Sequence, residues 1–180
     1  RSVWHRLKHA YDERFDSATH LRTCDEHLDT NWRYGEPLIA AALARNDPAA
    51  AEGLVARTVS SLLRLKCDQP WLPEQPLWEA RRYGRSPEED RALLDLLTRW
   101  EAVAQARSDG ARAASCRLQR TLWTAADRWL DVLAAFEDFS KRGGKPAVGE
   151  ELFAAWRAHE VATCRGCQGE ADSKDDQSWV

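Results

Sequence analysis

Apolar residues recur at spacings of three and four along most of this chain, and breaks rich in proline, glycine, asparagine or aspartate separate the apolar stretches. Spacings of three and four place side chains on one face of an α-helix, whereas a strand needs alternation, which the sequence nearly lacks. Ala, Leu, Arg and Glu dominate and Val and Ile are sparse, a composition typical of helices. The sequence therefore predicts an all-α fold of six or seven helices, packed as a bundle or a short stack of helical hairpins.

Capping signals set the expected helix boundaries. Asp47 before Pro48, and Ser86 before Pro87, each combine an N-cap side chain with a proline at the first helical position. Proline-rich residues 67–78 form an irregular connector that we expect to pack against the fold through its apolar side chains. The expected helices cover about 2–28 (or two helices, with a second start near 16–17), 36–45, 48–65, 77–82, 87–107, 118 to the glycine-containing break at 141–146, and 148–162.

The segment 118–136 has the longest regular apolar stripe and is expected to be the central helix, with Trp129 and Leu133 buried. The stripe consists of Leu118, Leu122, Ala125, Trp129, Val132, Leu133 and Phe136. Similar stripes predict that Leu65 lies on the buried face of helix 48–65. The chain has nine tryptophans, of which Trp4, Trp100, Trp129 and Trp156 are expected in the core. Three tryptophans lie near loops: Trp32, Trp71 and Trp78. They either cover the ends of the bundle or form an exposed aromatic patch for a partner.

The length of 180 residues fits one domain, predicted over residues 1–168, followed by an acidic flexible tail over 169–180. The tail accounts for the whole net charge of −3, so the rest of the chain is neutral. A neutral domain argues against binding to duplex nucleic acid, although RNA is not excluded. Two Arg-Tyr-Gly triplets, at 33–35 and 82–84, each precede a helix and suggest a helical repeat.

No stretch approaches the roughly 20 apolar residues of a membrane span. Three of the five cysteines stand alone in the sequence, which does not match a secreted disulfide framework, so we expect reduced thiols and a cytoplasmic protein. Arg outnumbers Lys 21 to 5, which indicates the codon bias of a GC-rich bacterial genome.

The sequence Cys164-Arg165-Gly166-Cys167 is the clearest chemical motif. Zinc sites commonly use four ligands, and the two cysteines with His159, five residues before Cys164, supply three candidates. A redox role is a further alternative, although the motif follows a helix end and therefore lacks a helix N-terminus that would lower a thiol pKa. A frayed tail without a ligand is the interpretation that we favour, so no cofactor is predicted and zinc remains an alternative.

The first predicted helix carries a polar face rich in histidine. Imidazoles four residues apart with a carboxylate nearby can bind a transition metal or move a proton, whereas the simpler interpretation is a solvated helix face. The residues of this face are His5, His9, Asp12, Asp16, His20 and His27.

The same region contains Arg14 six residues before His20, and Arg22 five residues before His27. This spacing resembles the Arg-x4-6-His signature of the HEPN ribonucleases, which are helical bundles. The resemblance implies RNA cleavage by such an Arg and His pair at a dimer cleft.

No nucleotide-binding loop, nucleophile motif or paired-carboxylate pattern is present in the sequence. The chain is rich in Arg and Trp, which dominate interface hot spots. We therefore expect a non-enzymatic helical protein-interaction module with a protein partner, as a subunit or fragment of a larger bacterial assembly. The alternative is a HEPN-like ribonuclease or a metal-dependent enzyme that uses the histidine-rich face.

Overall fold

The structure, a computed structural model, describes residues 17–65, 69–77, 86–124 and 128–158. These residues contain seven α-helices and one short 3-10 helix, and no strand occurs among them. The predicted all-α class is therefore confirmed. The chain divides into two compact units, Arg1–Trp71 and Leu72–Val180, and each is described by itself. The single domain predicted over 1–168 stays a prediction.

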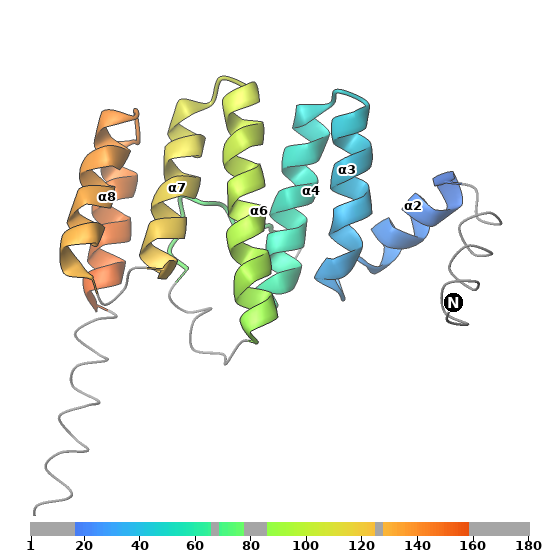
Figure 1. The fold of residues 1–180 in the computed structure, drawn as a ribbon, viewed down its shortest axis with the longest axis horizontal. Helices are drawn as coiled ribbons and strands as arrows, with labels where there is room; N and C mark the ends of the chain where they lie inside the picture. The colour runs from blue at the N-terminus through green and yellow to red at the C-terminus, as the bar shows by residue number, and fades with distance from the viewer. Residues whose placement is uncertain (1–16, 66–68, 78–85, 125–127, 159–180) are drawn as a thin grey trace, which may run out of the picture. The chain divides into compact units, whose positions relative to one another are not determined.

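The first unit contains α2 (Ser17–His27), the 3-10 helix η1 (Trp32–Tyr34), α3 (Gly35–Ala44) and α4 (Pro48–Leu62). The predicted start of α4 is confirmed, because the side chain of Asp47 accepts a hydrogen bond from the backbone N–H of Ala50 at 2.9 Å. Asn46 has a φ of 55°, a left-handed conformation that ends α3 and reverses the chain. Helices α3 and α4 therefore form a tight antiparallel hairpin (Figure 1).

Helix α2 and the α3–α4 hairpin share a small core of buried Cys24, Leu28 and Leu38. Arg57 of α4 adds a polar link, because its NH1 donates to Asp25 at 2.7 Å and its NH2 to Asp29 at 3.0 Å. Helices α3 and α4 approach closely at Gly35, where an added Cβ would overlap the side chain of Thr58. Glycine is needed at this position because the two helices approach too closely for a side chain.

The connector after α4 packs against the fold, as its apolar residues predicted. Trp71 and Leu77 are buried. The backbone N–H of Trp71 donates to Ser60 Oγ at 2.8 Å within the first unit. Within the second unit, the side-chain amide of Gln119 donates to the carbonyl oxygens of Pro73 and Gln75, both at 2.8 Å. These side-chain contacts take the place of regular secondary structure in a segment that proline keeps out of helices.

The second unit contains α6 (Pro87–Ala106), α7 (Gly110–Thr124), α8 (Trp129–Lys141) and a helix over 146–158. The predicted start of α6 at Ser86 is confirmed, and Ser86 and Glu89 form a capping box there. The backbone is left-handed at Ser108 (φ 59°), just after α6, and at Gly143 (φ 85°), just after α8. Such residues commonly end a helix. Successive helices of this unit run antiparallel (Figure 1). The hairpins α6–α7 and α8 with 146–158 are stacked through the contact between α7 and α8.

The prediction of one central helix over 118–136 is wrong, because α7 ends at Thr124 and α8 begins at Trp129. The chain reverses between them, so the two halves of the apolar stripe belong to different helices. Buried residues from α7, α8 and the helix over 146–158 form one core: Ala114, Leu118, Leu122, Val132, Phe139, Leu152 and Trp156. Trp129 and Leu133 are 51% and 40% exposed, so their predicted burial is also wrong. They share the period of the stripe, but the described helices cover them only in part.

Leu65 is a further correction, since it is 41% exposed and follows the end of α4 instead of continuing its buried face. The predicted tail over 169–180 and most of the short helix over 77–82 lie outside the described residues. Among the helices that the structure describes, none has the length and apolar character required to cross a membrane.

Candidate functional site

The zinc ligands suggested by the sequence, His159, Cys164 and Cys167, lie outside the described residues. Zinc at this motif therefore stays a prediction. Within the described part of the chain, no cluster of three or more His, Cys, Asp or Glu side chains is placed to hold a metal ion. Of the single cysteines, Cys24 and Cys116 are buried free thiols, and burial raises the pKa of both.

The histidine-rich face is described only in part. His5, His9, Asp12, Asp16 and Arg14 lie outside the described residues, whereas His20, Arg22 and His27 lie on α2. These three side chains are exposed. His20 Nε2 lies 3.6 Å from Cys24 Sγ, and the ring of His27 packs at 5.7 Å from that of Tyr34. RNA cleavage and metal binding at this face stay predictions.

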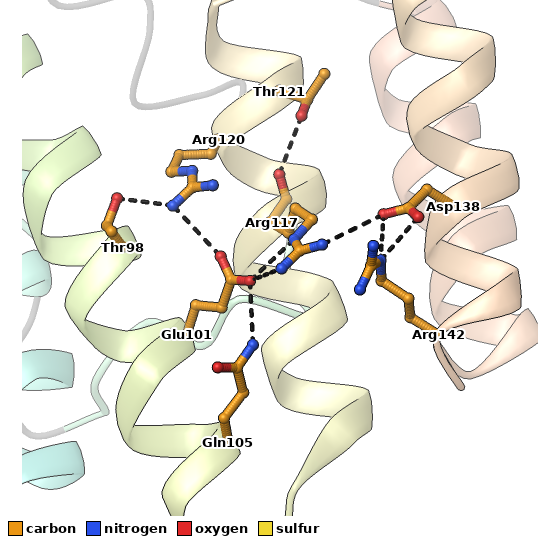
Figure 2. A network of polar contacts seen from close by, with 8 residues as sticks. All are labelled: Thr98, Glu101, Gln105, Arg117, Arg120, Thr121, Asp138 and Arg142. Carbon is orange, nitrogen blue, oxygen red and sulfur yellow. Dashed lines mark hydrogen bonds and ion pairs between the residues drawn. The ribbon is translucent and has the colours of Figure 1, made fainter.

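The main polar cluster that the structure describes is centred on Glu101 of α6, which sequence analysis did not identify. Glu101 is only 6% exposed. Arg117 of α7 donates to its Oε1 through Nε at 2.9 Å and also through NH2. Gln105 Nε2 donates to the same oxygen at 3.3 Å, and Arg120 NH1 lies 3.3 Å from Oε2 (Figure 2). The buried carboxylate is therefore surrounded by donors, which offset the cost of removing its charge from water.

The cluster extends to α8 through Asp138. NH1 of Arg117 lies 3.8 Å from Asp138 Oδ2, and Nε of Arg142 lies 2.7 Å from both oxygens of the same carboxylate. Figure 2 shows the guanidinium groups of Arg117 and Arg142 both reaching toward Asp138. Hydrogen bonding to Glu101 raises the pKa of Arg117, so this guanidinium keeps its charge. The cluster links α6, α7 and α8 by charge-assisted contacts.

A cleft of about 200 Å³ opens beside this cluster. Its polar lining comes from Glu101, Gln105, Arg117 and Arg142, and small residues, including Gly110, keep it open. Because Glu101 accepts from three side chains, it is poorly suited to act as a general base. The chemistry that the cleft offers is therefore hydrogen-bond donation by guanidinium groups.

The sequence itself indicates that Glu101 is buried. It follows Leu97 by four residues and precedes Ala104 by three, so it lies on the apolar face of α6. A carboxylate on a buried stripe predicts a cationic partner, although sequence spacing cannot identify which of 21 arginines supplies it.

A second candidate surface lies on α8, where Trp129, Leu130 and Leu133 are 51%, 77% and 40% exposed; we call these three residues the α8 patch. The ring of Trp129 stacks on that of Trp156 at a centroid distance of 5.1 Å. Trp156 itself is 1% exposed, and packing against it orients the half-exposed Trp129. The sequence analysis placed Trp129 and Leu133 in the core, so it did not identify this surface.

The remaining tryptophan predictions have mixed outcomes. Trp100 and Trp156 are buried, as predicted. Trp71 is also buried and so belongs to no exposed aromatic patch. Trp32 is half-buried, and the guanidinium of Arg33 lies 4.8 Å from its ring centroid. Trp4 and Trp78 lie outside the described residues.

Comparisons of the chain with protein-family models, with curated proteins and with solved structures found no match.

Proposed function

We propose that this chain is a helical protein-interaction module and that the α8 patch is its docking surface. The observation that carries the proposal is the exposure of Trp129, Leu130 and Leu133 within five consecutive residues of one helix. Folding leaves these apolar side chains in water, which is unfavourable unless another surface covers them. Trp129 is a suitable anchor because Trp is frequent among the residues that dominate binding energy.

The occupant that we propose is a short amphipathic helix of a partner protein. The patch consists of three side chains on one helix, whereas a standard stable interface uses roughly 20–30 residues and about 800 Å² per partner. This small area argues against a second copy of the chain or a large globular face as the occupant. A helix that inserts apolar side chains at positions i, i+3 and i+4 needs only a short apolar strip.

Two ion pairs lie beside the patch in the described part of α8 and its N-cap. Arg128 Nε lies 3.1 Å from Asp131 Oδ2, and Lys141 Nζ lies 2.6 Å from Glu137 Oε1. Because these pairs leave little uncompensated charge beside the patch, binding should depend mainly on apolar contact. We therefore expect the affinity for the partner helix to change little with salt concentration.

Photo-crosslinking in cells tests the proposal, with the crosslinking amino acid placed at Leu130. Ala154, exposed on the helix over 146–158, provides the matched control position. The cross-linked partner segment is identified by mass spectrometry and synthesised as a peptide. We expect an amphipathic helical segment that binds the full-length chain and binds the Leu133→Glu variant at least about tenfold more weakly.

Other occupants would contradict the proposal. A cross-link from position 130 to residues 159–180 of the same chain would identify an intramolecular cover, and a cross-link to a second copy would identify self-association. Equal binding of the peptide to the wild-type chain and to Leu133→Glu would remove the α8 patch as the docking surface.

A further inference from the structure

We propose that the cleft beside Glu101 binds an oxyanion, either a phosphate or a carboxylate group. The proposal is independent of the α8 patch, because it rests on the side chains that line the cleft. Its ligand would be held by the guanidinium groups of Arg117 and Arg142.

The first argument is the balance of charge. The cluster contains three guanidinium groups, from Arg117, Arg120 and Arg142, and two carboxylates, from Glu101 and Asp138. Three positive and two negative charges leave an excess of one positive charge. Of the side chains that line the cleft itself, Arg117 and Arg142 are cationic and only Glu101 is anionic. The lining therefore has the same excess of one positive charge, which favours an anionic ligand.

The second argument is the number of unused donors. Arg142 contacts Asp138 through Nε, and the described part of the chain shows no partner for its NH1 and NH2 groups. Arg117 uses Nε and NH2 on Glu101, while its NH1 lies 3.8 Å from Asp138, beyond hydrogen-bond distance. Both arginines therefore keep N–H groups available, and a planar guanidinium matches the geometry of carboxylate and phosphate oxygens.

The third argument is the way the two arginines are held. Glu101 holds Arg117, and Asp138 accepts from Nε of the half-exposed Arg142, so both guanidinium groups are partly ordered before a ligand arrives. The side chain of Arg117 is only 31% exposed, which makes its interaction with an anion stronger than at an open surface. Orientation before binding lowers the entropic cost of binding.

The volume of the cleft and its open edge also suit an oxyanion ligand. Its volume of about 200 Å³ accommodates a phosphate or carboxylate group with part of the molecule that carries it. Gly110 leaves its edge open, because a Cβ added there would meet only the backbone oxygen of Arg142, at 3.8 Å. The neighbouring Asp109 does not line the cleft, and its Oδ1 accepts from the backbone N–H of Arg112 at 3.0 Å.

Titration of the full-length chain with inorganic phosphate and with acetate, each at matched ionic strength in sodium chloride, tests the inference. Binding is measured by calorimetry and by the shift in melting temperature. We expect saturable binding of at least one anion, weakened at least about tenfold in Arg142→Gln. Arg128→Gln is the matched control, because Arg128 is the N-cap residue of α8 and lies outside the cleft lining, and this variant should bind as the wild type does.

A second pair of variants keeps the test valid if Arg142→Gln folds poorly. Gly110→Asp places a carboxylate at the edge of the cleft, and an acidic residue is also favourable in the first turn of α7. This variant should melt at a higher temperature without anion and should lose the response to added anion, whereas Gly110→Ala should keep the response.

The two anions identify the ligand chemistry. A response to phosphate alone supports a phosphoryl ligand, and a response that includes acetate supports a carboxylate ligand. The inference is overturned if neither anion binds saturably to the wild-type chain, or if Arg142→Gln and Gly110→Asp respond as strongly as the wild type does.

Discussion

Replacing Trp156 and Trp129 separately with alanine should give very different losses of stability, although both residues lie on apolar stripes of helices. Trp156 is 1% exposed and belongs to the core of α7, α8 and the helix over 146–158. Trp156→Ala removes a fully buried indole and leaves a cavity that its neighbours can only partly fill. We expect the free energy of unfolding to fall by about 3–5 kcal/mol.

Trp129→Ala should cost much less, because 51% of Trp129 already lies in water. About half of the transfer free energy of the side chain remains to be lost, and the vacated space opens to solvent instead of forming a closed cavity. Loss of the stack on Trp156, whose centroid distance is 5.1 Å, adds a further part. The expected total is about 1–2 kcal/mol.

Urea unfolding followed by far-ultraviolet circular dichroism measures both losses, since nine tryptophans make fluorescence difficult to assign to one site. The slope of free energy against urea concentration should stay constant, so that the midpoint reports stability alone. Equal losses for the two variants would refute the reasoning, because they would mean that Trp129 is buried as fully as Trp156.

Three further predictions concern the rest of the fold. Gly35→Ala should destabilise the first unit by about 1–3 kcal/mol in urea unfolding, because the new methyl group overlaps Thr58. Adding Thr58→Ala should recover part of that loss, and no recovery would argue against the close contact of α3 and α4. Ser86→Ala should reduce stability by about 1 kcal/mol through loss of the α6 cap, whereas Ser86→Asp, which retains a capping oxygen, should lose less; equal losses would contradict the capping box. The pKa of Cys116 is raised by burial, so its neutral thiol is favoured in the folded state, and this contribution to stability is complete at neutral pH and falls as the pH rises above about 8.5. Urea midpoints measured from neutral to alkaline pH should therefore decline more steeply for the wild type than for Cys116→Ala, and parallel declines would contradict this assignment.

The arrangement of charges could not be predicted from the sequence, and the reason is sequence distance. Glu101 and Arg117 are 16 residues apart on different helices, and Asp138 lies on a third. Helical periodicity relates residues three or four positions apart, so it does not say which cation reaches a given carboxylate. The cleft and its two arginines therefore appear only once α6, α7 and α8 are packed.

The sequence by itself determined where several helices start and end. Asp47 with Pro48 and Ser86 with Pro87 act through hydrogen bonds and dihedral restrictions within a few residues, so their effect does not depend on the rest of the fold. Leucines four residues apart lie on one face of a helix, and Leu93 and Leu97 of α6 are both buried.

The tertiary structure alone decided which apolar faces are covered. Trp129 and Val132 continue one regular stripe in the sequence, yet Val132 is buried and Trp129 is half exposed. A stripe specifies the side of a helix that is apolar, but burial requires a neighbouring helix on that side. The reversal of the chain between α7 and α8 sets which neighbours α8 has, and it leaves Trp129, Leu130 and Leu133 exposed to solvent.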